Sequence, residues 1–230
     1  MIELELNWTA FRASPLIAGL TQEELERFTA LWGVRLFRVE KRENIDRQLA
    51  RQHPGCMACL LSGGALVKKG DAEGNQAVLD FARPGCLLGC CGALTDMPFR
   101  GLSIAATAPS RLLVFRPQPL PTAQGDVYAL RLKIQKNLMG ILAQHSWQLM
   151  KKAEILSCRS LREKVLAFLS AQREYFHSDS FELPMDRQTL ADYLYINRSA
   201  LSRELGKLRE EGLINYRRSR FVLLFPPANM

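Results

Sequence analysis

Two short helices joined by three residues are the feature that most narrows what this sequence can fold into. The first helix is predicted over residues 185–194 with Asp186 as its N-cap, and the second over 198–211 with Asn197 as its N-cap. The small Ala191 allows the two helices to cross closely, so the spacing predicts a helix-turn-helix. Five apolar residues are predicted to form its buried face: Leu194, Ile196, Leu201, Leu205 and Leu208.

The second helix carries a basic, hydroxyl-bearing face at its N-terminal end. Its outward residues are predicted to be Arg198, Ser199, Ser202 and Arg203. A helix fits the major groove of duplex DNA, where arginine can donate two hydrogen bonds to guanine and serine can reach a base or a phosphate. These four residues are therefore candidate DNA-binding residues.

A hairpin with a basic tip follows the second helix. Its strands are predicted over 213–217 and 221–225, and Arg217 and Arg218 are candidates for contact with phosphate. The 230 residues carry a net charge of +8, and half of that excess lies in the second helix and the hairpin. A solvated amphipathic helix pair is the alternative, but it does not account for a capped basic helix followed by a basic hairpin.

Short apolar runs broken by glycine and proline fill residues 34–115. Such runs are typical of the strands of a compact antiparallel barrel or roll. A capping box formed by Thr21 and Glu24 predicts a short helix that starts there and ends at about Trp32, before these apolar runs. We assign residues 1–122 to an antiparallel β-roll of the double-stranded β-helix, or jelly-roll, type.

A long helix of about seven turns is predicted next, because Gly140 is the only glycine or proline between residues 126 and 173. An apolar stripe along it needs a partner, which is either its own β-domain or the same helix of a second copy. The coiled-coil dimer is favoured. Four residues of this stripe are the candidate dimer contacts: Ile134, Leu138, Ile141 and His145.

A second capping box, formed by Ser160 and Glu163, predicts that a new helix starts there, which places a domain boundary near Ser157. The predicted class is α+β. Residues 123–157 form the dimerisation helix and hinge, and residues 158–230 form a winged helix-turn-helix domain.

From Pro15 to Leu224 the chain resembles the Crp/Fnr family of bacterial transcription regulators, most specifically over 190–194, 198–203 and 208–214. The resemblance implies a cyclic-nucleotide-binding-type β-roll and a homodimer that binds double-stranded DNA at an inverted-repeat operator, with RNA polymerase as a further partner. Tyr195 stands where the family's turn usually has glycine. Ser199 stands where many members have a glutamate that reads cytosine, which leaves room for a different preferred base sequence.

The phosphate-binding cassette of that family corresponds to Gly89, Cys90, Arg100 and Gly101. Cys90 stands where the family has the glutamate that binds a ribose hydroxyl, and Gly101 stands where it has serine or threonine. Arg100 can still pair with an anion. We therefore expect a small-molecule effector other than cyclic AMP, of unknown identity.

Most of the cysteines are clustered. Cys-x2-Cys spacing and a second cluster are a signal for metal binding or redox sensing, and His53 or a cysteine is a candidate haem ligand. However, a strand points residues three apart to opposite faces, and a thiol packs as an ordinary apolar group. Packing is favoured, so the cofactor is left unknown. Five of the six cysteines form the two segments: Cys56, Cys59, Cys86, Cys90 and Cys91.

No uncharged apolar run approaches the roughly 18 residues of a membrane-spanning helix. The first six residues carry two acids, unlike a secretory signal, so we expect a cytoplasmic protein with reduced thiols. Enzymatic function is not expected, because none of the three histidines lies in a catalytic motif. A thiol enzyme using Cys90 or Cys91 is the weaker alternative.

Overall fold

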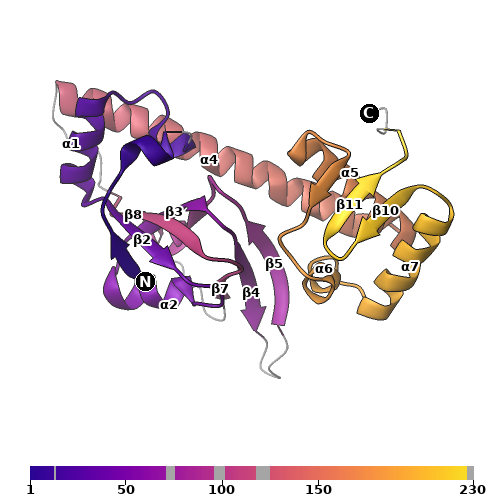
Figure 1. The fold of residues 1–230 in the computed structure, drawn as a ribbon. Helices are drawn as coiled ribbons and strands as arrows, with labels where there is room; N and C mark the ends of the chain where they lie inside the picture. Colours follow the sequence, from indigo (N-terminus) through magenta and orange to yellow (C-terminus); the bar gives the residue numbers. More distant parts are fainter. Residues whose placement is uncertain (13, 71–75, 96–101, 118–124, 227–230) are drawn as a thin grey trace. The chain divides into compact units, whose positions relative to one another are not determined.

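The computed structural model describes residues 1–12, 14–70, 76–95, 102–117 and 125–226 (Figure 1). The chain divides into two compact units, Met1–Ser146 and Trp147–Met230. Helix α4, Asp126–Ser157, spans this division, and the domain boundary near Ser157 stays a prediction. The other predicted boundary, at residue 122, lies outside the described residues.

The strands of the N-terminal unit form two antiparallel sheets, which confirms the predicted antiparallel β-roll. The five-stranded sheet has the order β1 (Ile2–Leu4), β2 (Arg35–Val39), β8 (Ser110–Phe115), β3 (Met57–Ser62), β6 (Leu87–Leu88). The three-stranded sheet has the order β5 (Gln76–Ala82), β4 (Ala65–Gly70), β7 (Leu102–Ala106).

Both faces of the five-stranded sheet are covered. Alternate residues of β3 and β8, such as Cys59 and Leu113, pack with α1 (Gln22–Trp32) and α4. The residues between them, such as Leu60 and Leu112, pack with the second sheet. The continuous apolar runs of these strands follow from this double burial, because neither face of β3 or β8 meets water. The remaining helical segments of the unit are η1 (Trp8–Phe11), η2 (Pro15–Ile17), α2 (Ile45–Gln52) and α3 (Cys90–Leu94).

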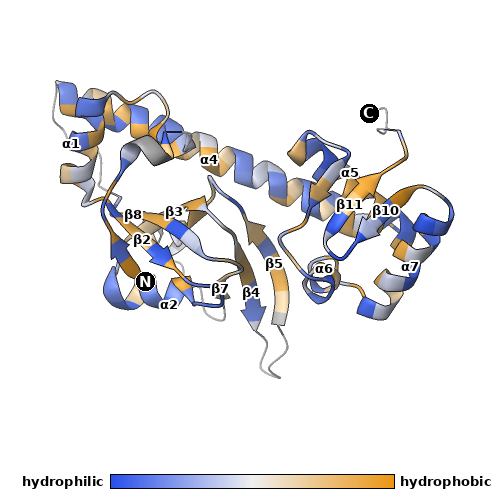
Figure 2. Cartoon of the chain, viewed as in Figure 1, coloured by the Kyte–Doolittle hydropathy of each residue, from blue (hydrophilic) through white to orange (hydrophobic). Residues whose placement is uncertain are grey.

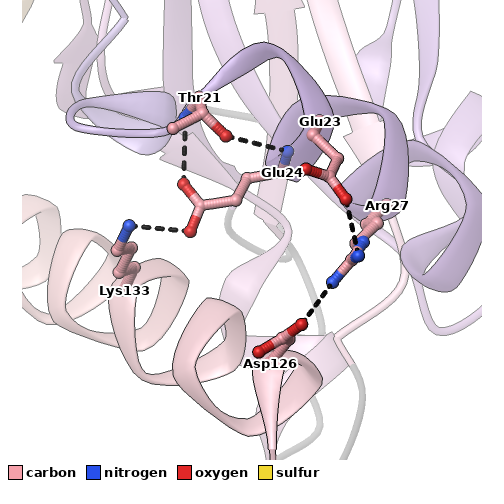
Figure 3. Close-up of polar contacts among 6 residues, drawn as sticks. All are labelled: Thr21, Glu23, Glu24, Arg27, Asp126 and Lys133. Atoms are coloured by element: carbon pink, nitrogen blue, oxygen red, sulfur yellow. Dashed lines mark hydrogen bonds and ion pairs between the residues drawn. The ribbon is translucent and has the colours of Figure 1, made fainter.

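The start of α1 is held by polar contacts to itself and to α4 (Figure 3). The predicted capping box is confirmed, since the Glu24 N–H donates to the Thr21 hydroxyl at 3.2 Å and the Thr21 N–H donates to the Glu24 carboxylate at 2.9 Å. Lys133 of α4 donates to the other Glu24 oxygen at 2.7 Å and lowers the pKa of that carboxyl. Arg27 bridges Glu23 at 2.6 Å and Asp126 at 3.5 Å.

Helix α4 has 32 residues and is therefore longer than the seven turns predicted. Hydrophobic and hydrophilic residues alternate along its whole length (Figure 2). Ile134 and Ile141 are buried in the core beneath α1, and Leu138 is partly buried against the same core. The stripe predicted to pair two copies is thus occupied by the chain's own β-domain, which was the other partner considered for it.

His145, the fourth candidate dimer contact, also faces its own unit. Its Nε2 lies 2.7 Å from the Asp80 carboxylate on β5. This hydrogen bond raises the pKa of His145, against an opposing effect of burial.

The C-terminal unit contains the end of α4, the helices α5, α6 and α7, and a small sheet of order β10-β11-β9. Strand β9 was not predicted, because its three residues are too short to show an alternating pattern and it pairs with β11 far along the chain. The elements are α5 (Leu161–Phe176), β9 (Ser180–Glu182), α6 (Arg187–Tyr193), α7 (Arg198–Glu210), β10 (Ile214–Arg217) and β11 (Arg220–Leu223). None of the helices within the described ranges is long and apolar enough to cross a membrane.

Candidate nucleic-acid interface

Helices α6 and α7 begin at the two N-caps predicted from the sequence. The Asp186 carboxylate accepts a hydrogen bond from the Thr189 N–H at 2.8 Å, and this bond lowers the pKa of Asp186. The Asn197 side chain accepts one from the Ser199 N–H at 2.8 Å. A side-chain acceptor at the N-cap satisfies backbone N–H groups that have no partner within the helix. Both helix starts are therefore determined by local sequence.

The turn between the helices holds Tyr195 in a backbone conformation that usually calls for glycine. Tyr195 has a φ of 53°, in the left-handed region that favours glycine. The turn is closed by a hydrogen bond from the Ile196 N–H to the Ala191 carbonyl at 3.0 Å. Ile196 is half-buried, and the other predicted apolar positions are fully buried: Leu194, Leu201, Leu205 and Leu208.

The four candidate base-reading residues are all exposed. Arg198 lies four residues before Ser202, and Ser199 four residues before Arg203, so each pair shares a helix face and the two pairs lie side by side on α7. Burial of the leucines on the opposite side leaves this face outward. The structure thus brings together the four residues that sequence reasoning selected on this helix.

The hairpin that follows α7 has a tighter tip than predicted. Arg217 pairs with Arg220 in the β10–β11 ladder, so Arg218 and Ser219 alone form the tip and Arg220 belongs to a strand. Arg217 and Arg218 are exposed, and Arg218 has a φ of 56°. Both candidate phosphate contacts are therefore open to solvent beside the tip.

Arg187, at the start of α6, holds the hairpin and was missed by sequence reasoning. Its guanidinium lies 5.0 Å from the Tyr216 ring and 5.4 Å from the Phe221 ring. It also donates to the Arg218 carbonyl at 3.1 Å. Burial lowers the pKa of Arg187. No local pattern indicated this contact, because about 30 residues separate Arg187 from the tip.

Lys152, near the end of α4, was also missed. It is only 6% exposed, and its Nζ lies 3.8 Å from the centroid of the Tyr193 ring and 5.6 Å from that of Tyr195. A cation over an aromatic face is attracted by the ring quadrupole. Within the C-terminal unit, this lysine joins the end of α4 to α6 and the turn.

The candidate effector pocket is described only in part. Gly89 has a φ of 72°, and Cys90 begins α3 and packs against the core beneath α1. Arg100 and Gly101 lie outside the described residues. The pocket therefore stays a prediction.

The cysteines are divided between the two cores of the N-terminal unit. Cys59 and Cys90 pack with the core beneath α1, whereas Cys56 and Cys86 pack with the core between the sheets. Cys56 and Cys59 thus lie on opposite sides, as a strand requires. Burial raises the pKa of Cys59 to about 12 and also raises that of Cys86. The Cys91 side chain is not described, and among the described residues no three histidine, cysteine or acidic side chains gather to hold a metal.

Residues 163–228 match the family model of the Crp-like helix-turn-helix domain. The nitrogen fixation regulation protein FixK of Bradyrhizobium diazoefficiens is 30% identical over 160 residues, which are 62% of this chain and only 59% of FixK. The solved structure of FixK2 from Bradyrhizobium japonicum aligns with a TM-score of 0.64 at 19% identity, over 84% of this chain and 93% of that one. A CRP/FNR-family transcriptional regulator from Thermus thermophilus aligns with a TM-score of 0.55 at 20% identity, over 83% and 93%.

These similar proteins are described as regulators and not as enzymes. The chain therefore carries a Crp-like helix-turn-helix domain at its C-terminal end, and most of its length has the fold of solved Crp/Fnr-family structures.

Proposed function

We propose that this protein is a homodimeric, sequence-specific DNA-binding transcription regulator. The observation that carries the proposal is the exposed basic face of α7, which begins at a capped N-terminus and is followed by a basic hairpin. FixK, the relative at 30% identity, is named as a regulation protein. A helix of this kind enters the major groove with its N-terminal residues toward the bases.

The two basic elements serve different purposes in this proposal. Arg198 and Arg203 reach base edges, where a guanidinium can donate two hydrogen bonds to guanine. Arg217 and Arg218 contact phosphate, which positions the domain on the duplex without reading sequence. Arg187 keeps the hairpin tip in place by its bond to the Arg218 carbonyl.

A second apolar stripe on α4 supports dimerisation. Tyr128, Leu132, Met139, Leu142 and Leu149 are all exposed, and Met139 is 70% exposed. With Gln135 and Ser146 these positions recur at alternating steps of four and three residues, which is the spacing of a coiled-coil seam. The seam adjoins a hollow of about 330 Å³ lined in part by Trp32, Leu138 and Met139. We therefore assign the dimer contact to this stripe in place of the buried one.

Two-fold pairing predicts the form of the operator. Dimers of helix-turn-helix domains read two half-sites about one helical turn apart, so the operator is an inverted repeat. RNA polymerase is the partner on which the DNA-bound dimer acts.

A small-molecule signal at the β-roll modulates DNA binding in this proposal. The candidate pocket contains Gly89 and Cys90, with Arg100 as the anchor for an anion and Gly101 beside it. Cys90 cannot supply the carboxylate that holds a ribose hydroxyl, so cyclic AMP is not the expected effector. A redox response of the cysteines is the second candidate, although the raised pKa values of Cys59 and Cys86 make these two thiols poor nucleophiles.

The test of DNA binding is selection of bound duplexes from a random pool, followed by titration of affinity against salt. We expect enrichment of an inverted repeat and a steep fall of affinity with salt, because binding releases counterions from phosphate. Failure to enrich any duplex would overturn the proposal.

The test of the signal is calorimetric titration with cyclic AMP and cyclic GMP, beside DNA binding with and without dithiothreitol and a chelator. Weak cyclic-nucleotide binding is expected. Tight binding would contradict the pocket assignment, and a response to oxidant or chelator would favour the cysteines as the sensor.

A further inference from the structure

Ser199 lies on the exposed face of α7, next to the cap of the helix, and its hydroxyl is already committed to a bond. The hydroxyl donates to Asn197 Oδ1 at 2.6 Å, and the Ser199 N–H donates to the same oxygen at 2.8 Å. A serine hydroxyl has one proton to give and two lone pairs that accept. Its role toward DNA therefore depends on where that proton goes.

The direction of the hydroxyl bond follows from the backbone. A backbone N–H can only donate, so the Asn197 atom that it reaches must be the carbonyl oxygen of the amide and not its nitrogen. That oxygen can only accept, so the Ser199 hydroxyl must donate its proton to it. The outward part of the Ser199 oxygen is left with lone pairs alone.

We propose that Ser199 is a specificity-determining residue that accepts a hydrogen bond from the exocyclic amino group of adenine or cytosine. In the major groove these amino groups are donors, whereas guanine presents N7 and O6 and thymine presents O4, all acceptors. Phosphate oxygens carry no proton to donate, so the bond to Asn197 likewise disfavours phosphate as the partner of the Ser199 hydroxyl. The inference rests on the proposed DNA-binding function and names the chemistry of one base contact.

The cap of the helix thereby sets which bases the helix selects. Turning the Ser199 hydroxyl toward an acceptor base would exchange one hydrogen bond for another and gain nothing net. Accepting from an amino group keeps the bond to Asn197 and adds a second bond. A single hydrogen bond of this kind corresponds to about a three- to tenfold preference in affinity.

The experiment uses the duplex enriched by the full-length protein. In one half-site, one hydrogen-bonding group of one base is removed at a time. Purine replaces adenine, or pyrimidin-2-one replaces cytosine, to remove the amino group, and 7-deaza bases remove the N7 acceptor. Each duplex is titrated with the wild type and with Ser199→Ala. At one position we expect amino-group removal to weaken the wild type about three- to tenfold more than the variant, whereas N7 removal affects both proteins equally.

Two variants of Asn197 test whether the base preference depends on the direction of the hydroxyl's hydrogen bond and not only on the presence of the hydroxyl. Asn197→Gly removes the acceptor but keeps a residue tolerated at N-caps, so the hydroxyl is free to donate and the preference for the amino group should fall. Asn197→Asp keeps an acceptor oxygen, so the preference should remain even though the added charge weakens binding to all duplexes. A preference unchanged in Asn197→Gly would contradict the role of the cap.

The outcomes distinguish this inference from the function on which it rests. If the protein enriches a duplex but amino-group removal affects the wild type and Ser199→Ala equally at every position, Ser199 reads no amino group and DNA binding stands. If instead the loss follows N7 removal, Ser199 is a donor and the inference is wrong. If no duplex is enriched, both the function and the inference are overturned.

Discussion

Arg203 and Arg218 are both exposed arginines, but their positions predict different effects on DNA binding. Arg203→Ala should cost about 1–3 kcal/mol on the operator and relax discrimination at one base position, because Arg203 lies on the outward face of α7. Arg218→Asn should weaken operator and random duplexes alike, because a hairpin-tip side chain reaches phosphate. Asparagine is chosen since it tolerates the left-handed backbone of Arg218. Fluorescence anisotropy on both duplexes measures the two losses. If each variant loses as much affinity for random duplex as for the operator, the assignment of Arg203 to a base is wrong.

The His145–Asp80 pair predicts a pH dependence of stability. The pKa of His145 is raised above its ordinary 6.5 in the folded chain by its bond to Asp80. A raised pKa contributes stability that is fully present below about pH 6.5 and is lost as pH rises through the folded-state value. The free energy of unfolding of the N-terminal unit should therefore fall across this window. Chemical denaturation followed at several pH values measures the slope.

The matched variant for that measurement is His145→Gln, which can still donate to Asp80 but does not titrate in this range. We expect the loss of stability above pH 6.5 to be smaller in His145→Gln. A wild type and a variant with identical pH profiles would show that the pair contributes nothing to the dependence.

At the scale of elements, Lys152 is the contact that joins α4 to α6 inside the C-terminal unit. Its buried ammonium lies 3.8 Å from the Tyr193 ring centroid. Tyr193→Leu should destabilise the unit, because a buried cation loses the aromatic face that stabilises it. The loss should be smaller in a Lys152→Met background, with a coupling free energy of about 2 kcal/mol. A double-mutant cycle by urea denaturation gives this coupling. A coupling free energy of zero would show that the contact does not stabilise the unit.

At the scale of the whole molecule, the two stripes of α4 predict opposite outcomes for substitution. Met139→Glu places a charge on the exposed seam, so it should leave the chain folded but monomeric and weaken operator binding. Ile134→Asp places a charge in the core and should unfold the N-terminal unit. Gln144→Glu adds the same charge to an exposed position off the seam and should change neither property. Sedimentation and circular dichroism separate these results, and a dimeric Met139→Glu would place the interface elsewhere.

The sequence by itself determined the features that depend on near neighbours along the chain. The N-caps Asp186 and Asn197 and the capping boxes at Thr21 and Ser160 were readable because each satisfies backbone groups within three residues. The outward face of α7 was readable for the same reason, since helical spacing alone opposes it to the buried leucines. The antiparallel roll followed from the density of short runs and turns.

Only the tertiary structure decided which partner each element meets. The stripe at Ile134 and Ile141 was assigned to a second copy because periodicity shows that a face is buried but not what covers it. The contacts of Arg187 and Lys152 could not be predicted, because their aromatic partners lie far along the chain and no local pattern encodes such a contact. The commitment of the Ser199 proton likewise needed the side-chain geometry of the cap, because a hydroxyl that can donate or accept shows its choice only when the groups around it are placed.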